Sequence, residues 1–329
     1  MLQVAGPSLL ATIQDAGRPD FADLGVPPAG ACDPWARAAA NLILGNAPDA
    51  PVLELTLSGP DLLVEQTGVL ALAGADLGAL VAGEARPLPP GAAYLVRGGS
   101  TIRFGRPRAG ARAYLALPGG IVVPRVLGAA ATYLPGAFGG FDGRALRPGD
   151  RLAAARPADR AAAGRQWPDA LAPPPYAGPA VARVVLGPDS ARFAPEAVET
   201  LAGSTWTVAP QSDRMGLRLQ GPRLAHASPA DAQIVSRGVV WGALQVPADG
   251  QPICLLADHQ TVGGYPVIGV VARADFAVLA QLPPGATLRF RVVRLAEAQS
   301  AYRAQAAGLA AAAVALARPD PWDALPDAR

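Results

Sequence analysis

A polar stretch at residues 258–266, DHQTVGGYP, separates two apolar runs of the sequence. It offers a carboxylate, an imidazole, an amide, a hydroxyl and a phenol, whereas a tight turn would need only the glycine pair, which tolerates positive φ. Asp258 and His259 could act as general bases, and the neutral groups beside them suit an amide or carboxylate ligand. We therefore predict a ligand-binding turn, the alternative being a solvated loop. The candidate binding residues are Gln260, Thr261, Gly263, Gly264 and Tyr265.

Two other segments, TIQDAGR at 12–18 and APQSDRMG at 209–216, also gather polar side chains. The planar guanidinium of Arg214 suits a carboxylate, a phosphate or bicarbonate. Asp15 is a third candidate base, although pairs such as Asp15 with Arg18 are common and weak at surfaces, so a local ion pair or a solvated loop is the alternative. The further candidate binding residues are Gln14, Arg18, Gln211, Asp213, Arg214, Gln245 and Gln251.

The chain contains no lysine, since all 28 of its basic residues are arginine. This excludes a Schiff-base lysine, a P-loop lysine and a lysine that carries covalent biotin. The formal net charge is +2 and the arginines are scattered, so no basic stripe for nucleic acid is evident. Two cysteines and two histidines would need carboxylates to complete a transition-metal site. We predict neither a metal site nor a nucleic-acid partner.

A length of 329 residues suggests about two domains. The 37 glycines and 35 prolines are spread along the chain, which favours many short strands joined by turns. Helices are expected over 33–46, over 193–203 and from 297 to about Ala317, before Pro319. A weak similarity between LTLSGPDLLVE (55–65) and LRLQGPRLAHA (217–227) favours two related β units.

No apolar run reaches the roughly 18 residues that a membrane-spanning helix requires. The first residues, MLQVAGPSLLATIQDAGR, lack the basic region of a signal peptide. We therefore predict a cytoplasmic protein.

Longer motifs follow one another in a defined order: LLATIQDAGRPDFADLGVPPAGACDPWARAAANLILGN, LELTLSGP, GGFDGRALRPGD, PQSDRMGLRLQG and SRGVVWGALQVPADGQPICLLADHQTVGGYPVIG. Together they resemble the biotin-dependent carboxyltransferase-like family, also called the KipA or allophanate hydrolase subunit 2 family, over residues 3–295. The resemblance implies a mainly β fold of tandem cyclophilin-like β-barrels with a few short helices and a C-terminal helix. The implied parts are a first barrel at 1–160, a Pro/Ala-rich linker at 161–180, a second barrel at 181–295, and a C-terminal helix and tail at 296–329.

The resemblance further implies the C subunit of an ATP-dependent 5-oxoprolinase, a hydrolase that opens the lactam of 5-oxo-L-proline to L-glutamate. Its partners would be a KipI-like B subunit together with a lactam-utilisation A subunit, without which the chain is expected to be inactive. ATP would be used on one of these partners, with no covalently bound biotin on this chain. In this interpretation Arg214 binds the substrate carboxylate, while Gln245, Gln260 and Thr261 contact the amide.

Two alternatives stay open. One is a biotin-dependent carboxyltransferase component that acts on urea or a related amide, with biotin delivered by a partner. The other is a non-enzymatic KipA-type regulator that binds a KipI-like kinase inhibitor.

Overall fold

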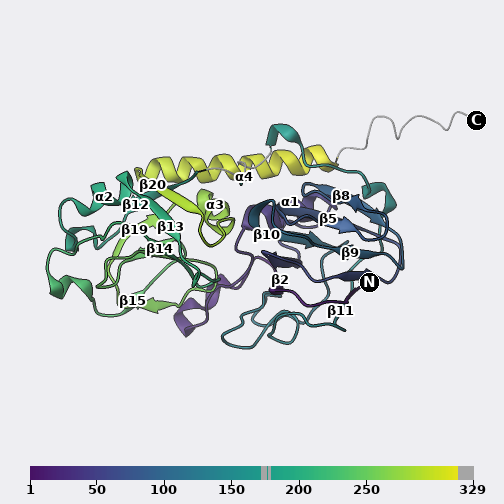
Figure 1. The fold of residues 1–329 in the computed structure, drawn as a ribbon, viewed down its shortest axis with the longest axis horizontal. Helices are drawn as coiled ribbons and strands as arrows, with labels where there is room; N and C mark the ends of the chain where they lie inside the picture. The colour runs from purple at the N-terminus through teal and green to yellow at the C-terminus, as the bar shows by residue number, and fades with distance from the viewer. Residues whose placement is uncertain (172–175, 177–178, 318–329) are drawn as a thin grey trace, which may run out of the picture.

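The computed structural model describes residues 1–171, 176 and 179–317. It contains two strand-rich units, and the long helix α4 (Leu295–Ala317) runs along one edge of both (Figure 1). The predicted mainly β fold with few helices is confirmed. Strands of the first unit lie between Leu2 and Leu152, and those of the second between Ala180 and Val292. The exact predicted limits of the domains stay predictions. Six residues of the predicted linker at 161–180, namely 172–175, 177 and 178, lie outside the described residues.

The first unit consists of two antiparallel sheets that enclose one core. Their strand orders are β11-β1-β4-β9-β6-β7 and β2-β3-β10-β5-β8. Apolar side chains from both sheets meet in the core, for example Leu55 and Leu115 from one sheet and Ile102 from the other. The strands are β1 (Leu2–Val4), β2 (Leu10–Gln14), β3 (Val52–Thr56), β4 (Leu62–Val64), β5 (Gly68–Asp76), β6 (Leu80–Val81), β7 (Arg86–Pro87), β8 (Ala92–Val96), β9 (Thr101–Arg103), β10 (Ala109–Ala116) and β11 (Arg151–Leu152).

The second unit is a closed barrel with the strand order β12-β19-β16-β17-β14-β13-β20. Parallel pairing of β12 with β20 closes it, and Trp206 is fully buried in its core. A separate two-stranded sheet, β15 with β18, lies outside this ring of strands. The strands are β12 (Ala180–Leu186), β13 (Thr205–Val208), β14 (Gly216–Gln220), β15 (Arg237–Gly238), β16 (Ala243–Gln245), β17 (Ile253–Leu255), β18 (Val262–Gly263), β19 (Val267–Val271) and β20 (Thr287–Val292).

Four α-helices accompany the strands in the described part of the chain. As expected, Asp33 caps α1 (Pro34–Ile43), since its side chain accepts a hydrogen bond from the Ala36 N–H at 2.8 Å. α2 (Ala197–Gly203) and α4 also lie in the predicted regions, whereas Pro319 is outside the described residues; α3 (Phe276–Ala280) was not expected. The 3-10 helices are η1 (Pro19–Leu24), η2 (Arg160–Ala162), η3 (Asp169–Leu171), η4 (Ser190–Arg192), η5 (Pro229–Ala232) and η6 (Arg273–Asp275).

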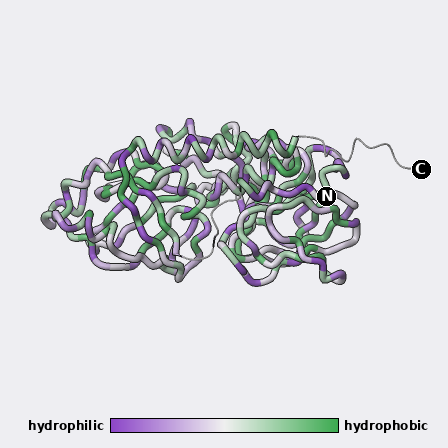
Figure 2. The backbone as a smooth tube through the Cα atoms, turned by 90° about the horizontal axis from the view of Figure 1, so that it is seen from above, coloured by the Kyte–Doolittle hydropathy of each residue, from purple (hydrophilic) through white to green (hydrophobic). Residues whose placement is uncertain are grey.

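Helix α4 connects the two units on one side. Leu309, Ala312 and Leu316 pack with the alanine-rich face of α1, while its earlier turns contact β12 and η6. Apolar segments occur in both units and along α4 (Figure 2). None of the helices in the described residues is both long and apolar enough to cross a membrane.

Candidate functional site

The junction between the two units is polar, and Arg214 from the second unit lies at its centre. Its Nε and one Nη each donate to a carboxylate oxygen of Asp258, both at 2.9 Å. The remaining N–H groups donate to Glu54, to the sulfur of Cys32 at 3.2 Å and to the carbonyl oxygen of Gly30 at 2.7 Å. A guanidinium has five N–H donors, so every one of them has an acceptor within the protein.

The buried positive charge of Arg214 is stabilised by the negative charges of Asp258 and Glu54. Burial lowers the pKa of Arg214, but the carboxylates of Asp258 and Glu54 outweigh it and hold that pKa well above its usual range. Glu54 also accepts from the Cys32 N–H at 2.9 Å and from the Tyr114 hydroxyl at 2.8 Å. Burial raises the pKa of the Cys32 thiol to about 12, which keeps it neutral. We call Arg214, Asp258, Glu54 and Cys32 the junction cluster.

A second contact across the junction comes from Gln281, which follows α3. Its Oε1 accepts from the backbone N–H groups of Ala111 and Arg112, both at 3.0 Å. Its Nε2 donates to Asp33 at 2.8 Å and to the Arg112 carbonyl at 2.9 Å. Side-chain hydrogen bonds therefore fix the orientation of one unit against the other at two separate points.

Sequence reasoning missed Glu54 and Gln281. Glu54 is the only charged residue in the apolar run VLELTL (52–57), and a lone carboxylate inside a buried strand is a signal that could have found it. Gln281 follows a short apolar helix, where a polar residue is common, so nothing in the sequence around it indicates a contact between the units.

Arg18 is the second buried arginine at the junction, with only 2% of its surface exposed. Its Nη2 donates to the Ala131 carbonyl at 2.5 Å and its Nε to the Val126 carbonyl at 3.3 Å, while the guanidinium lies 5.0 Å from the centre of the Phe138 ring. No carboxylate of the described residues lies within 4.0 Å of it, and its Nη1 is buried without a hydrogen-bond partner. Burial lowers the pKa of Arg18, although the more distant Asp15 and Asp258 act against this.

Gln14 lies beside Arg18, because its Nε2 donates at 3.1 Å to the carbonyl of Thr132, next to the Ala131 carbonyl that Arg18 binds. The Oε1 of Gln14 is buried and has no partner. Asp15 shapes the turn between them, since its carboxylate accepts from the Gly17 N–H at 2.8 Å and the Ala130 N–H at 2.6 Å. Oδ2 of Asp15 also lies 3.7 Å from Nη1 of the exposed Arg125.

The backbone around Arg18 is strained. Leu127 follows Val126 and Ala137 precedes Phe138, and both have a φ value of 52°. At Gly139 an added Cβ would lie 2.1 Å from the Ala131 oxygen and 2.9 Å from Nη2 of Arg18. Strain of this kind concentrates at functional sites, where the surrounding structure holds it in place.

The second unit contributes Gln245, His259 and Gln260. Oε1 of the buried Gln245 accepts from Nε2 of Gln260 at 3.0 Å, whereas Nε2 of Gln245 is buried without a partner. The His259 Nδ1 lies 2.7 Å from the Gln260 carbonyl, which can only accept, so Nδ1 carries the proton and Nε2 has the free lone pair. Burial lowers the pKa of His259, which favours this neutral ring.

The structure thus gathers some of the predicted site residues and not others. Gln14 and Arg18 lie together in the first unit, and Gln245, Asp258, His259 and Gln260 are linked in the second. Thr261, Gly263 and Gly264 lie along the β15–β18 sheet and its ends, and Tyr265 is 41% exposed. Three others lie in turns: Gln211 is exposed, Asp213 accepts from the Met215 N–H, and Gln251 pairs with the backbone of Gly221.

Arg214 was predicted to bind a substrate carboxylate, but in this arrangement it has no N–H left to offer a ligand. Arg18 retains one at Nη1. Nε of the buried Arg112 also has no hydrogen-bond partner, but it lies 4.0 Å from Glu54. Among the predicted site residues, Arg18 Nη1, Gln14 Oε1 and Gln245 Nε2 leave one charged donor, one acceptor and one neutral donor unsatisfied. Buried polar groups without partners are rare in folded proteins, so we take Arg18, Gln14 and Gln245 as the candidate site. His259 is added because Gln260 links it to Gln245.

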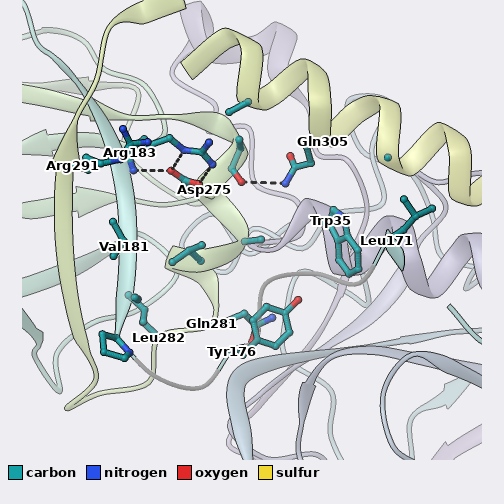
Figure 3. Close-up of a pocket in the computed structure, with 17 residues that line it drawn as sticks. Trp35, Leu171, Tyr176, Val181, Arg183, Asp275, Gln281, Leu282, Arg291 and Gln305 are labelled. Carbon is teal, nitrogen blue, oxygen red and sulfur yellow. Dashed lines mark hydrogen bonds and ion pairs between the residues drawn. The ribbon is translucent and has the colours of Figure 1, made fainter. Parts of the chain in front are cut away.

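A cavity of about 550 Å³ lies elsewhere, between the units on the α4 side (Figure 3). Its lining includes Trp35, Val181, Gln281 and Gln305. Arg183 also lines it, and the Nε and Nη2 of Arg183 each donate to one carboxylate oxygen of Asp275. None of the predicted site residues lines this cavity, and we locate the candidate site by its unsatisfied polar atoms instead. Within the described residues, no group of three or more His, Cys, Asp or Glu side chains is arranged to hold a metal ion.

Comparison with known proteins gives a consistent picture. A family model described as "Carboxyltransferase domain, subdomain A and B" matches residues 24–292. The chain is 36% identical to the 5-oxoprolinase C subunit of Escherichia coli (strain K12), covering 93% of this chain and 95% of that protein. The corresponding protein of Haemophilus influenzae is 34% identical over 92% of this chain and 94% of its own length. The urea amidolyase of Lachancea kluyveri is 31% identical over 88% of this chain, which spans only 17% of that protein.

Solved structures agree with these matches. The urea amidolyase of K. lactis superposes with a TM-score of 0.88 and 28% identity over 94% of this chain, which spans about a fifth (20%) of that structure's chain. TTHA0988 superposes with a TM-score of 0.78 and 35% identity over 88% of this chain, and this chain spans 56% of it.

Proposed function

This chain belongs to the carboxyltransferase domain family, subdomains A and B, and from this we propose that it is the C subunit of an ATP-dependent 5-oxoprolinase. The complex would open 5-oxo-L-proline to L-glutamate, with a KipI-like B subunit together with a lactam-utilisation A subunit as partners. The two relatives named as 5-oxoprolinase C subunits support this proposal because they match nearly the whole chain and nearly all of their own length.

The observation that carries the proposal is the unsatisfied Nη1 of Arg18. A buried cation without a carboxylate partner is costly, and an incoming carboxylate would relieve that cost. The carboxylate of 5-oxoproline fits this requirement. Its lactam N–H would donate to Oε1 of Gln14, and its lactam oxygen would accept from Nε2 of Gln245, so each unsatisfied atom receives the partner that its chemistry requires.

His259 is the base in this proposal. Its neutral ring has a lone pair on Nε2, whereas Asp258 is held by two hydrogen bonds from Arg214 and Asp15 by two backbone N–H groups. Nε2 takes a proton from the attacking water, the ring C–N bond breaks, and the ring nitrogen takes up a proton to become the amine of glutamate. ATP, bound on a partner protein, supplies the driving force by transferring its γ-phosphoryl group to the lactam oxygen. After ring opening that group is left on the new carboxyl as an acyl phosphate, and a second water releases it as inorganic phosphate, so each turnover consumes one ATP and two waters and yields glutamate, ADP and phosphate.

The test is glutamate release from 5-oxoproline and ATP by the complex of this chain with its KipI-like and lactam-utilisation partners. Arg18→Met should lower kcat/KM by roughly 100-fold, the cost of a lost charge-assisted hydrogen bond to the substrate. Arg108→Met, at an exposed arginine of the same unit, is the matched control and should leave the rate unchanged. A complex that releases no glutamate would rule out the function, and an active Arg18→Met complex would rule out the site.

A second candidate, carboxyl transfer to urea or a related amide, is favoured by the superposition on urea amidolyase. Because the chain lacks lysine, biotin would have to arrive on a partner chain. Carboxyl transfer would require bicarbonate and would be lost on adding avidin. Glutamate release that is insensitive to avidin and independent of bicarbonate would exclude this candidate for 5-oxoproline.

A further inference from the structure

Large apolar side chains are exposed on the segments that surround the candidate site. Val235 is 93% exposed and Leu24 is 73% exposed. The strand β15 and the purple segment η1 both lie on the edge of the molecule opposite α4 (Figure 1). We call the following exposed residues the apolar rim: Leu24, Leu127, Met215, Val235, Val240, Val262 and Tyr265.

Most rim residues are close in the chain to a residue of the site or of the junction cluster. Leu24 ends η1, which begins immediately after Arg18. Leu127 follows Val126, whose carbonyl accepts from Arg18. Val262 lies on β18, beside Gly263, where an added Cβ would lie 2.3 Å from the unsatisfied Nε2 of Gln245. The remaining members extend this surface, because Val235 and Val240 flank β15, the strand that pairs with β18.

This combination is unusual for a surface that stays in water. Isolated exposed apolar residues are normal, but a group of them bordering one polar site marks a surface for association. The site itself would also work better when covered, because electrostatic interactions with a ligand strengthen when water is excluded.

The rim also carries uncompensated negative charge. Asp20 and Asp23 are exposed on η1, and in the described part of the chain neither has an ion-pair partner within 4.0 Å. A partner that covers the rim would therefore be expected to present basic side chains opposite η1.

We propose that the apolar rim is the docking surface for a different subunit of the same enzyme, one with an apolar face bordered by basic residues. The proposal rests on the function proposed above. Two findings favour another chain over a second copy. The relatives that match this chain end to end are named as one subunit of an enzyme, and in TTHA0988 the matched part is 56% of a longer chain, so further polypeptide is attached there. The docking partner would correspond to that further polypeptide of TTHA0988.

The experiment uses calorimetry to measure binding of the purified full-length chain to its purified KipI-like partner. Val235→Asp and Val262→Asp should each weaken the affinity by at least about 30-fold, because they place a charge in an apolar contact. The matched controls are Leu9→Asp and Val314→Asp, which alter exposed apolar residues just before β2 and on α4. Asp20→Asn with Asp23→Asn should slow association and reduce its dependence on salt.

The outcomes separate this proposal from the proposed function. Unchanged affinity of both rim variants would overturn the docking surface, even if the wild-type complex releases glutamate. Self-association of the chain through the rim, seen by sedimentation and lost in Val235→Asp, would assign the surface to a second copy and also overturn it. Weakened binding of the rim variants alone would support the surface, even if the wild-type complex releases no glutamate and the proposed function fails.

Discussion

Arg214 and Arg18 are both buried at the junction of the two units, and they differ in what surrounds them. Arg214 is enclosed by two carboxylates, a thiol and a carbonyl, and each of its N–H groups has an acceptor. Arg18 contacts two carbonyls and the face of a phenyl ring, and one of its nitrogens has no partner. Arg214 therefore connects the two units, whereas Arg18 keeps one buried nitrogen without a hydrogen-bond partner.

The contrast shows why burial alone does not identify a site. Both arginines are at most 4% exposed, so exposure would rank them together. Counting satisfied hydrogen-bond groups separates them, because a protein seldom leaves a buried donor unpaired without a reason. The same count distinguishes Gln281, whose amide is fully used across the junction, from Gln14 and Gln245, whose amides are not.

The largest expected effect is on the junction cluster. Arg214→Met removes the cation that Glu54 and Asp258 share and leaves both carboxylates buried without it. We expect the free energy of unfolding to fall by roughly 3–5 kcal/mol. Urea unfolding of the isolated chain, followed by tryptophan fluorescence, measures this loss.

The control for this prediction replaces the carboxylates as well. Arg214→Met combined with Glu54→Gln and Asp258→Asn should recover much of the lost stability, because neutral amides do not need a cation beside them. A single Arg214→Met variant as stable as the wild type would remove the distinction between the two arginines.

The next effect concerns the unsatisfied amide of Gln245. In Gly263→Ala the added Cβ would lie 2.3 Å from Nε2 of Gln245, so the flexible amide must turn away. We expect kcat/KM of the complex to fall roughly 10- to 100-fold with little loss of stability, since one hydrogen bond to the reacting amide is lost. Gly238→Ala on the paired strand is the control, because its nearest atom is 4.0 Å away. Equal activity of the two variants would remove Gln245 from the site.

The sequence predicted the fold better than it predicted the site. Asp33 and Pro34 indicate α1 because a cap and a first-turn proline act locally, whereas α3 has five residues and no side-chain cap and was not predicted. Arg18, Gln14 and Gln245 were among the candidate binding residues predicted from the sequence. The ion pair between Arg214 and Glu54 was not predicted, because Glu54 lies 160 positions away in the chain and only the folded junction brings the two side chains together. The residue type indicates which groups a side chain can bind. Only the folded structure shows whether other residues of the protein already occupy its hydrogen-bond groups.

A smaller effect is expected from the same substitution at the other arginine. Arg18→Met should change the free energy of unfolding by less than about 1 kcal/mol, or raise it, because it removes a buried cation that has no carboxylate beside it. Loss of the contact with Phe138 is offset by the apolar side chain of methionine. Urea unfolding beside Arg214→Met makes the comparison direct. A loss as large as that of Arg214→Met would show that Arg18 is also structural.

The smallest expected effect lies where the two regions meet, since Asp258 belongs to the junction cluster and His259 to the candidate site. Burial lowers the pKa of His259 below its ordinary value of 6.5, so the folded protein keeps the ring neutral while the unfolded chain takes up a proton. Its contribution to stability is therefore complete above pH 6.5 and is lost as the pH falls from there towards the lowered pKa. The wild type should lose stability relative to His259→Gln between about pH 7 and pH 5, and groups that titrate alike in both proteins cancel in this difference. A difference that does not change with pH would mean that the ring takes up a proton as readily in the folded protein as in the unfolded chain, and burial would then not be what keeps His259 neutral.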